Sequence, residues 1–176
     1  MKKIGLFILY VVLFIAALLF FTPKENLYYF AEEQLKPMGV VIGYEDAIDH
    51  GFTLEISHAQ LYFKKIKSAD VGSINIAIFG LYNAIDIKNI VLDSAAEQFF
   101  PPLIEHIEIR QNIFAPLEIS AQALGDFGEA QAVVNLSDRN GTVLLTPSKL
   151  MSKRYRNTLR QLKRTKEGTY RYAFKF

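Results

Sequence analysis

The side chains that could perform catalysis are few, and they lie in no known catalytic motif. The chain has no cysteine, which excludes thiolate catalysis, disulfides and zinc–thiolate sites together. Its serines occur in no Gly-x-Ser-x-Gly sequence, and neither a Gly-x-x-x-x-Gly-Lys loop nor a Gly-x-Gly-x-x-Gly fingerprint is present. We therefore expect a protein that works by binding, without enzymatic activity and without a cofactor.

Two groups of histidines and acids come closest to a reactive site. His106 and Glu108 resemble part of a zinc deaminase motif, but the cysteine pair of that motif is missing. On a strand they would share a face, which favours a plain ion pair. The second group consists of Asp46, Asp49, His50 and His58. Its spacing matches no known ligand pattern, so we expect no metal site.

Cationic side chains gather near the C-terminus. Residues 148–176 hold ten Lys or Arg against one acid, whereas the preceding 147 residues hold ten basic and seventeen acidic groups. Such a patch attracts anionic partners, here a lipid head group or an acidic protein surface. The candidate binding residues are Lys153, Arg154, Arg156, Arg160, Lys163 and Arg164. The alternative is a solvated basic helix face.

An uncharged run of eighteen residues, Ile4–Phe21, follows Lys2 and Lys3. As a helix it would be about 27 Å long, close to the hydrocarbon thickness of a bilayer. Each Leu, Ile, Phe or Val favours insertion by about 0.3–0.6 kcal/mol. We expect residues 1–22 to form a cytoplasmic tip and a transmembrane anchor. The anchor residues include Ile4, Phe7, Leu13 and Phe21.

The flanking charges predict the orientation of this anchor. Lys2 and Lys3 precede it and Glu25 offsets Lys24, so we expect the N-terminus in the cytoplasm and the C-terminal domain across the membrane. A cleaved signal peptide is the alternative, but it expects a shorter apolar core and a small-x-small cleavage site. A cysteine-free, single-pass chain suits the bacterial inner membrane with its domain in the periplasm, where nucleic acid is not an expected partner.

Residues 23–38 are predicted to form a juxtamembrane amphipathic helix that ends near Pro37. The side chains expected on its apolar face are Leu27, Phe30, Ala31 and Leu35. This helix could cap the following domain or lie on the bilayer surface.

From residue 39 the hydrophobic period changes to two, which predicts β-strands. Asp46–Gly51 is expected to be a connection. A slip in the alternation between Ile87 and Ile90 indicates a bulge or a strand boundary near Asn89. Asn140–Gly141 predicts a tight hairpin turn.

A basic helix is expected at about residues 148–163, followed by a last strand at Tyr170–Phe176. About eight or nine strands in consecutive hairpins, each with one apolar face, predict an antiparallel meander that must curl or be covered. The expected fold is a single N-terminal transmembrane helix plus one mainly-β domain, residues 39–176. In it, a curved antiparallel sheet forms an open jelly-roll-like groove with short helices near both ends.

The order of elements resembles the type II secretion system protein N family. At the back, the resemblance lies in the strand Gly141–Pro147, the leucine-bearing helix Leu150–Leu162 and the acidic-Gly-x-aromatic turn Glu167–Tyr170. At the front, the membrane helix is followed by the short helix Leu27–Leu35 and by apolar strands such as Phe52–Phe63. The resemblance extends to the wider AsmA-like proteins, whose periplasmic β-grooves are implicated in lipid traffic. It implies no catalytic residues.

Two functional hypotheses follow. The first is an inner-membrane-anchored accessory or scaffold protein of envelope export, similar to type II secretion N, with other secretion or transport subunits as partners. The second is a lipid or lipopolysaccharide transfer module, AsmA-like or similar to the lipopolysaccharide-transport protein C. A lipid module needs a continuous apolar channel that is open at both ends, whereas a scaffold needs a core filled by its own side chains.

Overall fold

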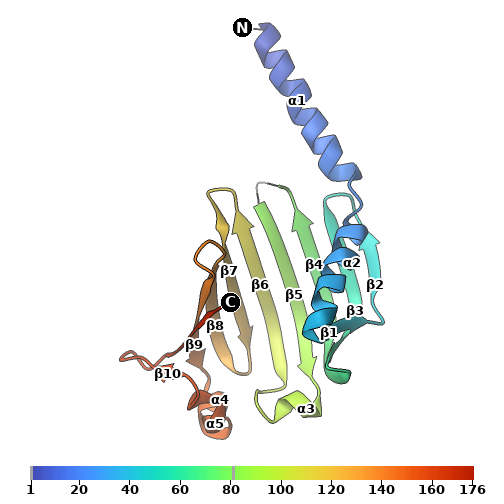
Figure 1. Ribbon diagram of the computed structural model, residues 1–176. Coiled ribbons are helices and arrows are strands. Elements are labelled where there is room, and N and C mark those ends of the chain that lie inside the picture. Colours follow the sequence, from blue (N-terminus) through green and yellow to red (C-terminus); the bar gives the residue numbers. More distant parts are fainter. Residues whose placement is uncertain (1, 81) are drawn as a thin grey trace.

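One antiparallel β-sheet and one apolar N-terminal helix make up most of the molecule (Figure 1). The computed structural model describes residues 2–80 and 82–176. Within them, eleven strands form one sheet in the order β1-β3-β4-β5-β6-β7-β8-β9-β11-β10, with β2 also paired to β3. This confirms an open antiparallel sheet with short helices and an apolar N-terminal helix.

The elements follow one another with short connections. The strands are β1 (Val40–Gly43), β2 (Asp46–Asp49), β3 (Thr53–Phe63), β4 (Ile66–Ile78), β5 (Tyr82–Leu92), β6 (Leu103–Asn112), β7 (Ala115–Gly125), β8 (Gly128–Asn135), β9 (Asn140–Pro147), β10 (Lys163–Arg164) and β11 (Tyr170–Lys175). The helices are α1 (Lys2–Phe21), α2 (Lys24–Leu35), the 3-10 helix η1 (Lys36–Met38), α3 (Ser94–Glu97), α4 (Lys149–Arg154) and α5 (Arg156–Leu159).

Helix α1 is long and apolar enough to cross a membrane, over Lys3–Phe21. It projects away from the top of the sheet (Figure 1), and Phe20 in its last turn contacts Phe52 of the β2–β3 turn. The anchor residues Ile4, Phe7, Leu13 and Phe21 are all exposed. Solvent-exposed side chains of this kind along a whole helix are stable in lipid rather than in water.

Lys24 joins α1 to α2. Its side chain is 2% exposed, and its Nζ donates hydrogen bonds to the carbonyl oxygens of Leu19 and Thr22, the latter at 2.7 Å. These carbonyls lie at the end of α1, where a helix leaves its last acceptors unpaired and carries partial negative charge. The buried ammonium group therefore caps the C-terminus of the apolar helix.

Helix α2 forms at the predicted place but buries a different face. Lys24, Tyr28 and Glu32, spaced four residues apart, are its buried residues. Tyr28 packs into the apolar cluster of β3, β4 and β5. The predicted apolar face does not cap the domain, because Leu27 and Phe30 lie exposed. The polar groups at the two ends of the buried face are compensated, since Lys24 caps α1 and Glu32 lies 3.5 Å from Lys36.

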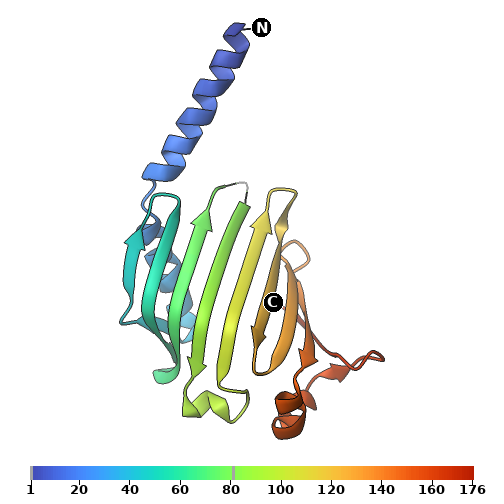
Figure 2. The same cartoon turned by 180° about the vertical axis from the view of Figure 1, so that it is seen from behind.

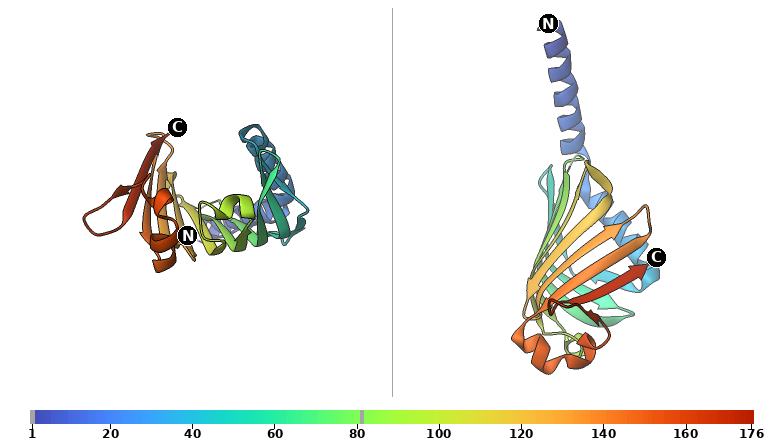
Figure 3. Two further views of the ribbon diagram at one scale, coloured as in Figure 1. Left: turned by 90° about the horizontal axis from the view of Figure 1, so that it is seen from below. Right: turned by 90° about the vertical axis from the view of Figure 1, so that its left-hand side faces the viewer.

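The sheet curves into a U. Seen from below, β1 to β3 with α2 form one arm, β5 and β6 lie near the base, and β9 and β11 form the other arm (Figure 3, left). Helix α2 covers the concave face of the first arm. From behind, the convex face of the sheet is free of helices (Figure 2).

In four neighbouring strands, the alternation of side chains between the two faces of the sheet reverses at one position. These four positions form a line across the sheet. His58, Gly72, Asn89 and Glu105 stand at facing positions of β3, β4, β5 and β6, between ordinary pairs such as Ser73↔Lys88 and Val71↔Ile90. His58 and Asn89 have positive φ, 57° and 55°. The predicted slip near Asn89 is therefore present, but β5 continues through it without a change of register. All four strands change phase together, so their apolar side chains stay on the concave face.

Two predicted turns differ from the structure. Asp46–Asp49 is strand β2 rather than part of a connection, because it pairs with Leu54–Ser57 of β3. Asn140 and Gly141 lie in β9, opposite Asn135 and Val134, and the hairpin turn occupies residues 136–139. Gly141 is required for a close approach instead, since a Cβ there would lie 2.4 Å from the Phe174 ring.

The predicted basic helix at 148–163 is wrong in its length. Helix α4 ends at Arg154, α5 ends at Leu159, and Lys163–Arg164 pairs with β11 as strand β10. Tyr155 interrupts the helix with φ −113° and ψ 36°. Two separate turns let Met151 and Leu159 both enter the apolar cluster that also contains Phe127 and Leu145. A run of like charges also gives little support to one long helix.

Candidate functional site

The concave face of the sheet is apolar from one arm of the U to the other. Strand register places eight residues side by side in one row across the sheet. That row is Leu54, Ile76, Ile85, Ile109, Ala121, Ala132, Val143 and Tyr172. A second row is Ile56, Ile74, Ile87, Ile107, Ala123, Ala130, Leu145 and Tyr170. Neither row contains a charged residue.

The row between them, on the convex face, has the opposite character. It consists of Glu55, Asn75, Asp86, Glu108, Gln122, Gln131, Leu144 and Arg171. An antiparallel sheet with one solvated face shows such an alternation, and its apolar face is then expected to meet another apolar layer. The apolar face is therefore the surface whose occupant has to be explained.

The two ends of the concave face are covered to different extents. On the first arm, Tyr28 of α2 packs with Leu54, Ile56 and Ile74. On the other arm, Phe127 and Leu145 pack with Met151 and Leu159 of α4 and α5. Between these clusters, β5 to β8 carry half-buried side chains in the two rows.

A cavity of about 310 Å³ lies on the concave face of the second arm. Its lining is wholly apolar or aromatic: Phe100, Ile104, Ala123, Phe127, Ala130, Val143, Leu145, Leu162, Tyr170 and Tyr172. Its floor includes Ala123 and Ala130, which face each other across β7 and β8. The isoleucines of the two rows give way to alanines at these strands, and the smaller side chains leave the space.

Three arginines stand beside this cavity. A second depression is lined by Ser152, Arg156, Leu159, Arg160, Leu162, Arg164 and Tyr170. It shares Leu162 and Tyr170 with the apolar cavity. Within residues 2–80 and 82–176, no ion pair joins Arg156, Arg160 or Arg164 to an acid. An apolar cavity and an uncompensated cationic depression are thus neighbours.

The other predicted basic residues lie apart from this depression. Lys153 and Arg154 are exposed on the last turn of α4. Lys163 lines a different shallow depression, with Arg171 and Tyr172. The sequence therefore predicted the basic region. Of its six candidate residues, only Arg156, Arg160 and Arg164 line the same depression.

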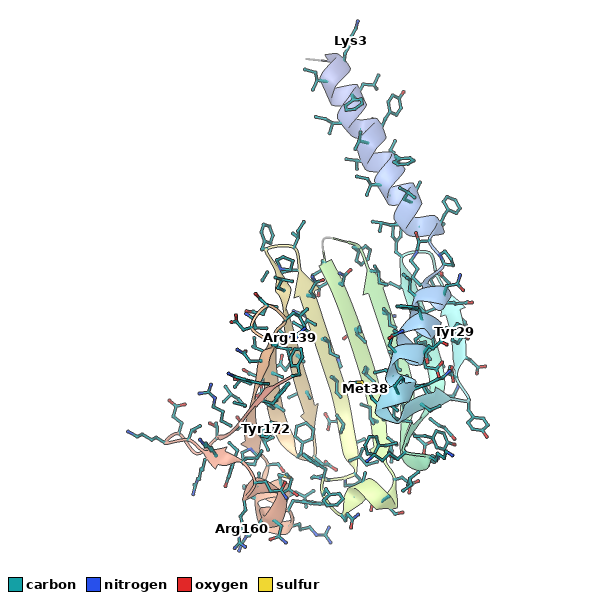
Figure 4. The ribbon with its side chains drawn as sticks, in the orientation of Figure 1. Lys3, Tyr29, Met38, Arg139, Arg160 and Tyr172 are labelled. Atoms are coloured by element: carbon teal, nitrogen blue, oxygen red, sulfur yellow. The ribbon has the colours of Figure 1, made fainter. Side chains whose placement is uncertain are left out.

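The basic region lies at the end of the sheet opposite α1. Helices α4 and α5 lie at the bottom of the sheet and strand β10 at its lower left edge, whereas α1 leaves from its top (Figure 1). Lys3 and Arg160 stand at opposite ends of the molecule (Figure 4). If α1 spans the membrane, the arginines are on the membrane-distal side of the domain.

The residues considered for metal or acid–base chemistry are dispersed. His106 shares the convex face with Glu108 but its Nε2 lies 2.8 Å from Asp86 Oδ1, and Glu108 pairs with Arg110. The predicted His106–Glu108 pair was therefore wrong, because the neighbouring strand supplies a nearer carboxylate. His58 lies 3.7 Å from Asp46.

Asp49 binds backbone N–H groups and is not part of a metal site among the described residues. Among the described residues, no group of three or more His, Asp or Glu is placed to hold a metal ion. Asp49 accepts hydrogen bonds from the backbone N–H groups of Lys24 (2.8 Å) and Gly51 (2.7 Å). Desolvation raises the pKa of the Asp49 carboxyl, but these bonds outweigh it and lower the pKa below 3.8.

Several lining residues were missed from the sequence. Phe100 lies in a segment that only breaks the strand pattern, and Phe127 lies in a tight β7–β8 turn, yet their rings meet with centroids 6.5 Å apart. Thr158 of α5 donates a hydrogen bond to the Phe99 carbonyl (2.7 Å), which joins α5 to the segment that carries Phe100. The sequence signal that could have identified Phe100 and Phe127 as lining residues is the presence of aromatic side chains in these loops. Comparison with protein-family models, curated proteins and solved structures gave no match to this chain.

Proposed function

We propose that this chain is a non-enzymatic, membrane-anchored lipid-binding module, which holds the acyl chains of an anionic lipid against the concave face of its sheet. The observation that carries the proposal is the pair of uncharged rows that cross the sheet from β3 to β11, with an apolar cavity on them. Contiguous exposed apolar surface of this kind marks ligand grooves or membrane and protein contacts.

The chemistry of the cavity fits hydrocarbon better than a polar ligand. Its lining offers no charged side chain, and only the hydroxyl groups of Tyr170 and Tyr172 are polar. Burying each CH₂ group of an acyl chain contributes about 0.8 kcal/mol. An eight-carbon segment would thus contribute about 6 kcal/mol before the cost of ordering the chain.

The three arginines support an anionic head group. Guanidinium groups bind phosphate through paired N–H donors, and here they adjoin the mouth of an apolar cavity. An amphiphile could place its chain on Ala123 and Ala130 and its phosphate near Arg156 and Arg160. This arrangement favours the lipid hypothesis over the side-chain-filled core that a pure scaffold needs.

The proposed location is the bacterial inner membrane, with Lys2 and Lys3 in the cytoplasm and the sheet in the periplasm. Lipid handling is also what the AsmA-like resemblance implies. The anchor then fixes one end of the groove at the membrane, while the arginine end faces away from it.

Lipid analysis of the purified protein tests this proposal. The full chain is extracted with a mild detergent, and copurified lipid is identified by mass spectrometry. The proposal expects phospholipid, or another phosphate-bearing lipid, to remain bound in amounts comparable to the protein. The absence of bound lipid after gentle extraction would contradict the lipid-binding function.

A second candidate is the accessory function in envelope export, through a partner strand. Strand β10 pairs only with Tyr170 and Arg171, so that the outer edge of β11 has no described partner strand from Tyr172 to Lys175. Such an edge can accept a strand from another protein. Crosslinks from Ala173 to a secretion subunit in cells would support this candidate, and a groove free of lipid would strengthen it.

A further inference from the structure

The hairpin tips beside α1 differ in composition from those at the other end of the sheet. The turns that reach highest on the α1 side are β2–β3, β6–β7 and, in its described part, Phe79 and Gly80 of β4–β5 (Figures 1 and 2). The β8–β9 turn, with Asp138 and Arg139, points the same way but lies lower. Residues 50–52, 79–82 and 112–116 contain no Lys, Arg, Asp or Glu. The opposite end carries Lys64 and Lys65 in the β3–β4 turn and the basic region of α4 and α5.

Aromatic contacts place two of these tips at the level of the last turn of α1. The ring of Phe20 lies 5.2 Å from that of Phe52 in the β2–β3 turn, and Phe52 stacks on Phe79 at 5.8 Å. Gly51 lets this happen, since it has φ +85° and a Cβ there would lie 2.3 Å from the Phe20 ring. The end of the membrane helix and the two turns are thus one apolar unit.

The third tip carries the most exposed large hydrophobic side chain among the described residues. Phe114 in the β6–β7 turn is 96% exposed, and Ile113 beside it is 50% exposed. Asn112 fixes the turn, because its Oδ1 accepts hydrogen bonds from the N–H groups of Phe114 (3.0 Å) and Ala115 (3.2 Å). A phenylalanine held in this position contacts water unless an apolar phase lies above the turn.

We propose that the three charge-free tips rest in the surface of the bilayer that α1 crosses, so that the concave groove opens onto the outer layer of lipid. The inference rests on the membrane anchor of the proposed function and adds a second contact with the same membrane. The bilayer is the expected occupant because the tips continue the apolar surface of α1 and carry aromatic side chains, which favour the membrane interface. Lipid could then enter the groove sideways, from the membrane.

Tryptophan fluorescence tests this contact, because the chain contains no tryptophan. Three single variants of the full chain, Phe114→Trp, Phe99→Trp and Leu13→Trp, are reconstituted into phosphatidylethanolamine–phosphatidylglycerol vesicles with and without brominated acyl chains. Phe114 and Phe99 are exposed phenylalanines at opposite ends of the sheet. Circular dichroism checks that each variant is folded, and Ile113→Trp replaces Phe114→Trp if that variant is not.

The expected result is a blue-shifted emission and a loss of fluorescence to bromolipid for Phe114→Trp, with neither effect for Phe99→Trp. Quenching of Leu13→Trp reports separately that the anchor is inserted. If Leu13→Trp is quenched and Phe114→Trp is not, the tip contact is wrong while the anchor stands. Equal quenching at Phe114 and Phe99 also overturns the inference, because the sheet would then lie flat. An unquenched Leu13→Trp overturns the anchor and the tip contact together.

Discussion

The backbone N–H of Lys24 donates a 2.8 Å hydrogen bond to the carboxylate of Asp49, and this bond joins the end of the apolar helix to the second strand of the sheet. The same lysine caps α1 with its side chain, and the same carboxylate binds the Gly51 N–H. One short segment thus connects the anchor, α2 and the β2–β3 turn. In the proposed function, the position of the groove relative to the membrane depends on this junction.

Replacing Lys24 should weaken the junction. In Lys24→Met the carbonyls of Leu19 and Thr22 lose their buried donor, and a buried unpaired polar group costs about 1–3 kcal/mol. We expect a matching loss in the free energy of unfolding of the full chain in detergent, followed by circular dichroism. Lys88→Met is the control, because Lys88 is exposed on β5 and takes part in no ion pair among the described residues. Equal losses in the two variants would contradict the capping function.

Asp49 should make stability depend on pH. Its pKa is lowered in the folded state, so the unfolded chain binds the proton more tightly. The stabilising contribution is present above the unfolded pKa of 3.8 and is lost as the pH falls through the lower folded value. Melting temperatures measured between neutral and acidic pH should fall less in Asp49→Asn than in the parent. Parallel curves for the two proteins would show that Asp49 contributes nothing to the acid sensitivity.

The phase reversal at Asn89 should tolerate glycine but not a β-branched residue. Asn89 has φ +55°, where a residue with a bulky Cβ costs about 1–2 kcal/mol. Asn89→Val is expected to lose about that much stability, whereas Asn89→Gly should stay close to the parent. Asn75→Val, at an exposed position on the convex face of β4, is the matched control in chemical denaturation. A similar loss for both valine variants would contradict a special backbone at Asn89.

The arginine depression should select anionic lipid. We expect Arg156→Glu/Arg160→Glu to lower the share of phosphate-bearing anionic lipid that copurifies with the protein, while total secondary structure is kept. Lys64→Glu/Lys65→Glu changes the net charge equally at the same end of the sheet, away from the cavity, and should leave the lipid profile unchanged. If both double variants shift the lipid profile alike, the effect belongs to overall charge rather than to a site.

Local pattern predicted much of this fold, but not the way its parts converge. Alternation at Tyr170 and Tyr172 predicted a last strand, yet their position beside Val143 and Leu145 follows from β11 pairing with β9. The buried face of α2 was not predictable from hydropathy, because Lys24 is buried by its bonds to the end of α1. The predicted basic helix was too long, because no feature of the local sequence shows that Met151 and Leu159 both enter one apolar cluster.

The cavity could not be predicted from the sequence either, because its lining residues come together only through strand pairing and loop packing. Ala123 and Ala130 are ordinary strand residues in sequence, and only the β7–β8 register sets them opposite each other. Phe100 and Phe127 come from loops in different parts of the chain. By contrast, the uncharged face itself was predictable, since each strand shows its apolar side chains at a period of two.

The measurement that tests the central claim most directly is the amount of lipid retained by Ala130→Phe compared with Gln131→Phe. Ala130 faces the cavity of about 310 Å³ on the concave side, whereas Gln131, its neighbour in β8, is exposed on the convex row. Both full-length variants are extracted gently, and their bound lipid is quantified by mass spectrometry. We predict that Ala130→Phe, with a ring filling the cavity, loses most of the retained lipid while Gln131→Phe keeps the parent amount. Equal lipid in all three proteins would contradict a lipid-binding groove on the concave face.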